Sequence, residues 1–130
     1  VLSGYGEVLV RTGKVDKGLE LLNKAFELDP VPQGQSTSDN RIKDLILGYF
    51  FAEDFNKVVE LSFDIRNMDI RSLILILFSR SKLDQDIKSS NEFSLFINDH
   101  KDTDWEQTVD RFHIQDETIK STIISFIKTI

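Results

Sequence analysis

The chain has 130 residues, of which 40% are hydrophobic and 29% charged, so it has the length and composition of one globular domain. Its formal net charge of -6 argues against nucleic acid as a partner, because phosphate binding needs a concentration of lysine and arginine; a basic or amphipathic protein surface is more compatible. The chain has no cysteine, which excludes disulfides, thiolate zinc sites and a cysteine nucleophile.

Neither a secretion signal nor a membrane helix is indicated by the sequence. The longest apolar run, over residues 73–78, is far shorter than the roughly 20 residues that a membrane helix needs. We therefore expect a cytoplasmic protein. Because the sequence opens on Val1 within a helical pattern, we interpret the chain as a piece of a larger protein.

The first 30 residues predict two helices joined by a turn. Gly13 predicts the turn, Asp16 the N-cap of the second helix, and Pro30 its end, since proline disfavours helical geometry in the preceding residue. Apolar and small residues recur at three- and four-residue steps on one face of that helix: Val15, Gly18, Leu19, Leu22, Ala25 and Phe26. The small residues among them predict a close approach by the first helix.

A set of residues at characteristic spacing carries a family resemblance: Tyr5, Gly6, Leu9, Gly13, Ala25 and the run Leu28-Asp29-Pro30. With these residues the stretch resembles a tetratricopeptide repeat, a helix-turn-helix unit of about 34 residues. Gly18 stands where that family usually has alanine, and Leu22 where it often has an aromatic residue. The resemblance implies an all-α fold of antiparallel hairpins stacked as a short α-solenoid, which binds a peptide or protein.

A second, weaker hairpin is predicted over 40–69. It follows a polar loop over 31–40, in which Ser36 with Asp39, or Ser38 alone, would cap the next helix. Its first helix contains Leu47-Gly48, which echoes Tyr5-Gly6. Its second helix is predicted from Phe55 to Met68-Asp69.

A third hairpin is predicted over 70–98. Residues 70–80 are apolar on nearly all sides, which favours a helix buried between layers, although so short a run also fits a buried strand. Residues 83–97 would supply the companion helix, with a break at Ser89-Ser90-Asn91.

Two C-terminal helices are predicted over 104–130. Thr103 and Glu106 have the spacing of a capping box, and the helix that they start has Trp105, Val109 and Phe112 on its apolar face. The last helix begins near Asp116 and carries a stripe of isoleucines: Ile119, Ile123, Ile124, Ile127 and Ile130. We expect this helix to cap the array; the alternatives are that its stripe docks on a further domain or forms a homodimer.

The predicted partner-binding surface is the concave side, which the first helices of successive hairpins line in a stacked array. Its outward residues are expected to be Glu7, Arg11, Leu45, Tyr49 and Glu53, with Ala52 beside them. An aromatic residue flanked by charges is typical of a peptide-binding surface. The alternative is that Tyr49 packs against a neighbouring hairpin and the charges are solvated. Family members that clamp a C-terminal carboxylate use lysine and asparagine here, and the two glutamates argue against that subtype.

The sequence gives little support for phosphate binding, metal binding or catalysis. The glycines near Lys14 lack P-loop spacing, and the acidic loop over 98–104 lacks the glycine and terminal glutamate of a calcium loop, so no cofactor or metal is expected. His100 and His113 belong to no nucleophile arrangement, and His113 is expected to be partly buried. We expect a noncatalytic protein-protein interaction scaffold. The alternative is a helical accessory or oligomerisation domain of a larger enzyme, such as a bacterial transferase.

Overall fold

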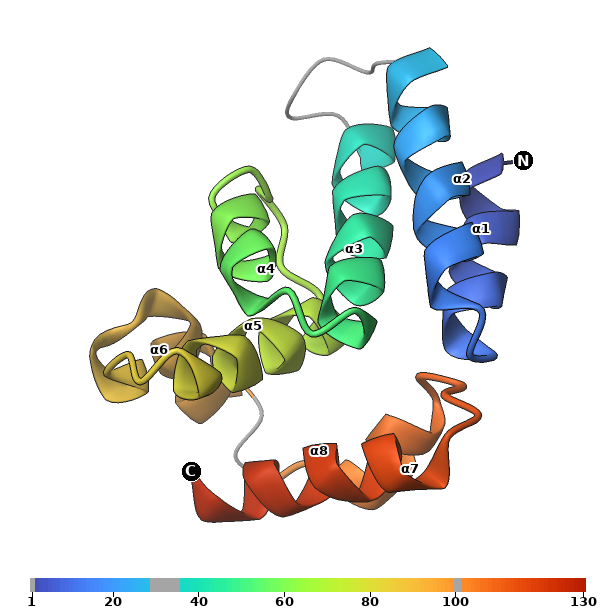
Figure 1. Cartoon of the computed structure of the whole chain (residues 1–130). Coiled ribbons are helices and arrows are strands. Elements are labelled where there is room, and N and C mark those ends of the chain that lie inside the picture. The colour runs from blue at the N-terminus through green and yellow to red at the C-terminus, as the bar shows by residue number, and fades with distance from the viewer. Residues whose placement is uncertain (1, 29–35, 100–101) are drawn as a thin grey trace.

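The structure is a computed structural model that describes residues 2–28, 36–99 and 102–130, and in these ranges the chain is all-α with no strand (Figure 1). The prediction of an all-α fold is confirmed. The helices are α1 (Leu2–Arg11), α2 (Val15–Leu28), α3 (Ser36–Phe51), α4 (Phe55–Ser62), α5 (Ile70–Lys82), the 3-10 helix η1 (Ile87–Ser89), α6 (Asn91–Asp99), α7 (Trp105–Asp110) and α8 (Glu117–Thr129). Across the described ranges, none of these helices is both long and apolar enough to cross a membrane.

Helices α1 and α2 form a tight antiparallel hairpin. Gly13 adopts a φ of 98°, a left-handed conformation that favours glycine, and makes the turn. A Cβ atom on Gly18 would lie 2.7 Å from the carbonyl oxygen of Gly6, so the two backbones are in direct contact. The predicted close approach of the helices is therefore confirmed.

One local prediction for α2 is wrong. The helix begins at Val15, so Asp16 lies in its first turn rather than at the N-cap. A negative charge in the first turn interacts favourably with the helix dipole. Phe26, at the end of the predicted apolar face, is 39% exposed. Pro30 lies outside the described residues.

Helix α3 packs on α2 and is longer than predicted. A Cβ atom on Gly48 would lie 2.5 Å from Cδ2 of Leu19, which shows how closely the second hairpin meets the first. Residues 36–40 are helical rather than part of a loop, so Ser38 lies within α3 and does not cap it. The rest of the expected loop, 31–35, lies outside the described residues.

Helix α4 is shorter than predicted. It starts after Asp54, whose side chain accepts a hydrogen bond from the amide of Lys57, and it ends at Ser62. Residues 63–69 are non-helical and lead to α5, so the prediction of a helix as far as Met68-Asp69 is wrong. Asp64 and Asn67 are residues that favour turns, which accounts for the early end.

Helix α5 is the centre of the molecule. Every residue from Ser72 to Ser79 is buried, which confirms the predicted buried helix and excludes the strand. In Figure 1, α1 to α4 run up and down, α5 crosses beneath α3 and α4, and α8 runs along the bottom. The predicted companion helix over 83–97 is only partly right: the chain breaks at Ser90 as predicted and α6 follows it, but residues 83–90 form a turn and η1 instead of an α-helix.

The C-terminal helices close the core from below. The α7 N-cap is Asp104, whose carboxylate accepts from the amide of Gln107 at 3.2 Å, so the predicted capping box at Thr103 is wrong. Helix α8 begins after Asp116 as predicted. Ile123 and Ile127 are buried in the main core cluster, and the isoleucine stripe therefore packs inside the molecule.

Candidate functional site

Glu7 and Arg11 belong to a charge network that joins three helices. They pair with each other along α1, and Glu7 Oε2 lies 3.9 Å from an η nitrogen of Arg71 on α5. The same arginine lies 3.4 Å from Asp44 Oδ1 on α3. Both predicted residues are only partly exposed, and Glu7 contacts α5 through Arg71.

The other predicted residues lie elsewhere. Leu45 is 5% exposed and belongs to the main core cluster, so the expectation that it faces outward is wrong. Tyr49 is half-buried; its hydroxyl lies 3.4 Å from Asn23 Nδ2 on α2, and Lys57 Nζ lies 5.9 Å from its ring centroid. Tyr49 therefore packs against its neighbours, and the predicted residues do not form one continuous surface.

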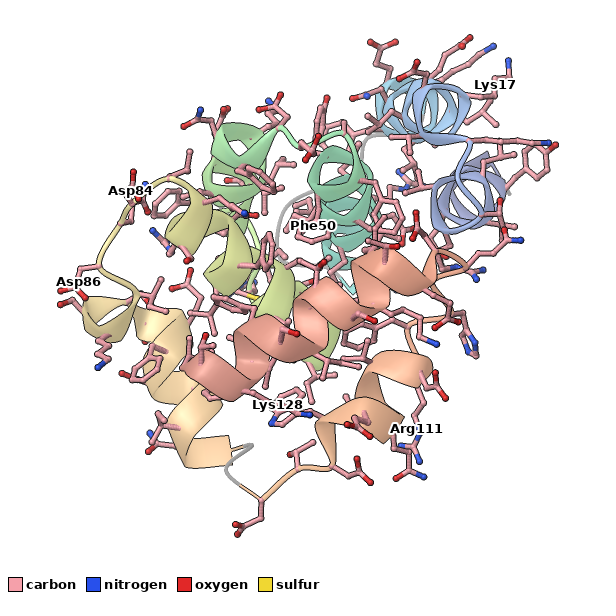
Figure 2. The ribbon with its side chains drawn as sticks, turned by 60° about the horizontal axis from the view of Figure 1, so that its bottom comes forward. Lys17, Phe50, Asp84, Asp86, Arg111 and Lys128 are labelled. Atoms are coloured by element: carbon pink, nitrogen blue, oxygen red, sulfur yellow. The ribbon has the colours of Figure 1, made fainter. Side chains whose placement is uncertain are left out.

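Glu53 lines a cavity of about 330 Å³ between α3, α5 and α8, which we name the phenylalanine pocket. Its lining residues are Phe50, Phe51, Glu53, Phe55, Phe78, Lys82, Ile119, Thr122 and Ile123. The phenyl rings pack edge to face, with centroids 5.3 Å apart for Phe50 and Phe78. Figure 2 shows Phe50 near the centre of the molecule, whereas Asp84, Asp86 and Arg111 lie at its edge.

A second hollow lies between the segment after α4 and helices α5 and α6. It has a volume of about 550 Å³, and we name it the Phe63 groove. Its lining residues are Ser62, Phe63, Ile65, Arg66, Asn67, Met68, Arg80, Asn91, Glu92 and Leu95. Phe63 itself is 77% exposed, the largest exposed fraction among the big apolar side chains of the described residues.

A buried ion pair forms one wall of the Phe63 groove. Arg80 Nη2 donates to Glu92 Oε1 at 3.0 Å, and Glu92 is only 7% exposed. Arg80 also donates to Gln85 and lies 6.0 Å from the ring centroid of Phe63. Held by three partners, this guanidinium is a preorganised part of the groove.

Sequence reasoning missed this groove because it placed Phe63 within a long α4. A signal was nevertheless available. Asp64 and Asn67 favour turns, and a phenylalanine beside such residues has no helical face on which to be buried. The groove also needs Arg80 and Glu92 from two later helices, and local periodicity cannot show that contact.

The titratable groups with shifted pKa values are surface pairs. A hydrogen bond from Lys120 lowers the pKa of Asp110, and the same contact raises the pKa of Lys120. A hydrogen bond from Ser89 lowers the pKa of Asp86. His113 is exposed, with a φ of 58°, so the expectation that it is partly buried is wrong; it sits in a turn that projects between α7 and α8. Among the described residues, no three histidine or acidic side chains come together as a metal site.

No protein-family model, curated protein or solved structure matches the chain significantly. No family is assigned. The resemblance to tetratricopeptide repeats therefore stays a prediction.

Proposed function

We propose that the chain is a noncatalytic interaction module, which presents a helical surface to a peptide or protein partner in the cytoplasm. The observation that carries the proposal is the exposure of Phe63 beside a groove of about 550 Å³. An isolated aromatic side chain in water gains nothing for folding, whereas at an interface it is a typical source of binding energy.

The composition of the Phe63 groove supports this proposal. Aromatic residues, methionine and arginine are the types enriched at protein interfaces, and the groove contains Phe63, Met68 and Arg80. Ile65, Met68 and Leu95 are each partly exposed, so they offer apolar surface to a partner side chain. The preorganised position of Arg80 reduces the entropy that binding would cost.

The alternative function, an accessory or oligomerisation domain of a larger protein such as a transferase, is favoured by a different observation. The first hairpin exposes Tyr5 by 59%, Val8 by 42% and Phe26 by 39%. Apolar side chains of this size on the outermost hairpin suit contact with a further domain or a second copy. The stripe of α8 is less suited to a homodimer, because Ile123 and Ile127 are buried within the chain.

The test selects peptides from a random display library against the whole chain and measures their affinity by fluorescence anisotropy. We expect Phe63→Ala to weaken binding at least tenfold, which is about 1.4 kcal/mol. The melting temperature should be almost unchanged, because the side chain is exposed.

Tyr5→Ala is the matched control, since it removes an exposed aromatic side chain from a different surface. It should leave peptide affinity within about twofold, as for a residue outside the binding site. Selected peptides that bind the Phe63→Ala variant as well as the wild type would overturn the groove as the site. If Tyr5→Ala instead dissociated a dimer seen in sedimentation, the oligomerisation function would be favoured.

A further inference from the structure

The phenylalanine pocket has no role in the function proposed above, and it shares no lining residue with the Phe63 groove. We infer that this pocket binds a small organic cation, in which a primary ammonium is attached to an apolar body about the size of a phenyl ring. The inference is independent of peptide binding at the groove.

The walls of the pocket suit an apolar body of that size. A volume of about 330 Å³ lies at the small end of ligand pockets, which suits a single ring better than a peptide segment. Phe50, Phe55 and Phe78 have their ring centroids 5.3 to 6.1 Å apart, and Ile119 and Ile123 line the pocket from α8. The rings hold one another in place by edge-to-face contacts, so the wall is already formed before a ligand arrives.

The oxygen atoms at the pocket favour a cation. Within the described part of the chain, the Glu53 carboxylate has no cationic partner, although it lines the pocket and is exposed. The hydroxyl of Thr122 donates to the carbonyl oxygen of Thr118 at 2.8 Å, which leaves the hydroxyl oxygen as an acceptor. An ammonium group has three donors and no acceptor, so it suits a pocket lined by acceptor oxygens of these two residues.

Lys82 brings a positive charge to the same pocket, opposite in sign to that of Glu53. Its Nζ atom lies 5.4 Å from the ring centroid of Phe78, the arrangement of a cation-π contact. The ammonium of Lys82 is therefore held over a ring and keeps its charge, whereas Glu53 forms no ion pair with any described residue. The net charge of -6 adds a long-range attraction for cations.

The backbone at Glu53 gives a second reason to connect this residue with binding. Glu53 has a φ of 59°, a left-handed conformation in which glycine is normally preferred. The conformation occurs at the turn between α3 and α4, which brings Glu53 to the lining of the pocket. A glycine would make the same turn without that charge.

The test compares three probes with the same phenylethyl body: phenethylamine, phenethyl alcohol and 3-phenylpropionate. Binding to the whole chain is followed by the methyl resonances of Ile119 and Ile123, which both line this pocket. We expect the amine to bind most tightly and the carboxylate least tightly. Glu53→Gln should weaken the amine about tenfold and leave the alcohol unchanged, because only the charged contact is removed.

Two further variants complete the design. Lys82→Met should strengthen amine binding, because it removes a competing cation and keeps the side-chain length. Glu20→Gln, on the exposed surface of α2 and away from the pocket, is the control for loss of one negative charge and should change nothing. A short peptide with N-terminal phenylalanine carries the same ammonium and ring, so its affinity relative to phenethylamine separates a peptide end from a free amine as the source.

The inference is overturned if 3-phenylpropionate binds most tightly, since Lys82 would then be the anchoring charge. It is also overturned if no probe shifts the two isoleucine resonances at millimolar concentration, or if the Glu53→Gln variant keeps the preference for the amine. None of these results affects peptide binding at Phe63, so failure here is distinguishable from failure of the proposed function.

Discussion

At the scale of single residues, three glycines set the distances between the first three helices. Gly6 and Gly18 bring the backbones of α1 and α2 together, and Gly48 receives the side chain of Leu19. Gly4, on the same helix as Gly6, has no atom within 4 Å of where its Cβ would lie. Close packing thus requires glycine at positions 6, 18 and 48, whereas at position 4 glycine only lowers the stability of the helix.

We predict that Gly18→Ala lowers the free energy of unfolding by about 1–3 kcal/mol, because the new methyl group would meet the carbonyl oxygen of Gly6. Gly4→Ala is the matched change in open space, and it should raise the free energy by about 0.5–1 kcal/mol through helix propensity. Urea denaturation measures both. Equal effects of the two substitutions would contradict the close contact.

Among the residues that the structure describes, Glu53 is one of three other than glycine with positive φ, together with Asp84 and His113. We predict that Glu53→Gly raises the free energy of unfolding by roughly 0.5–1 kcal/mol, since relief of left-handed strain outweighs the added entropy of the unfolded chain. Ala52→Gly, at the adjacent exposed position without positive φ, should lower it instead. Thermal denaturation of both variants would show whether the strain is real.

At the scale of elements, the positions of the helices could be predicted from the sequence better than the residues at which they begin and end. Helices α2, α5 and α8 carry strong apolar stripes or runs, and each was predicted close to its observed position. The early end of α4 was missed, because its pattern can be continued through Ile65 although Asp64 and Asn67 favour turns. The capping residues were also misplaced by one or two positions, since several oxygen-bearing side chains compete at each start.

The candidate site was harder to predict than the helices. Periodicity identifies which face of a helix is buried, but it does not identify the helix that covers that face. Leu45 was expected at the surface because the resemblance assigned it to a concave side, whereas in the structure it lies in the core. Glu53 was singled out correctly as an exposed acid, but the phenyl rings around it come from three different helices.

An ion pair between Asp110 and Lys120 joins α7 to α8, and its contribution to stability depends on pH. Lys120 Nζ lies 2.5 Å from Asp110 Oδ1, and this hydrogen bond lowers the pKa of the carboxyl and raises that of the amine. The stabilisation by Asp110 is complete above its unfolded pKa of about 4 and is lost as pH falls through the lower folded value. The stabilisation by Lys120 is complete below about pH 10 and is lost as pH rises through the higher folded value.

We predict that Lys120→Met returns the pKa of Asp110 towards its ordinary value, as followed by the carboxyl carbon resonance in an NMR titration. The melting temperature of the variant relative to the wild type should be constant between about pH 5 and pH 9 and should converge at low pH. An unchanged titration of Asp110 in the variant would show that the ion pair does not form in solution.

At the scale of the whole molecule, α5 is buried because other helices cover it on all sides. Helices α3 and α4 contact it from above in Figure 1, and α6 and α8 from the remaining directions. Phe78 links these layers, with ring contacts to Phe50 on α3 and to Phe126 on α8. The core is therefore one continuous cluster from the first hairpin to the last helix.

We predict that Ile123→Ala lowers the free energy of unfolding by about 2–5 kcal/mol, because Ile123 is fully buried between α8 and the rest of the core. Ile124→Ala, at the partly exposed neighbouring position, should cost clearly less. Urea denaturation provides the measurement. A small effect of Ile123→Ala would mean that α8 is detached in solution.

The turn between α7 and α8 also reaches back to the end of α1. The amide of Gln115 donates to the carbonyl oxygen of Arg11 at 3.1 Å, and an η nitrogen of Arg11 donates to the carbonyl oxygen of His113 at 3.2 Å. Open arrays of hairpins lose structure by fraying from their ends, since each unit touches only its neighbours. Here these two hydrogen bonds join the C-terminal end of α1 directly to the turn between α7 and α8. Amide hydrogen exchange should accordingly give α1 and α8 nearly the same free energy of opening. Both helices should open together when these two hydrogen bonds are broken.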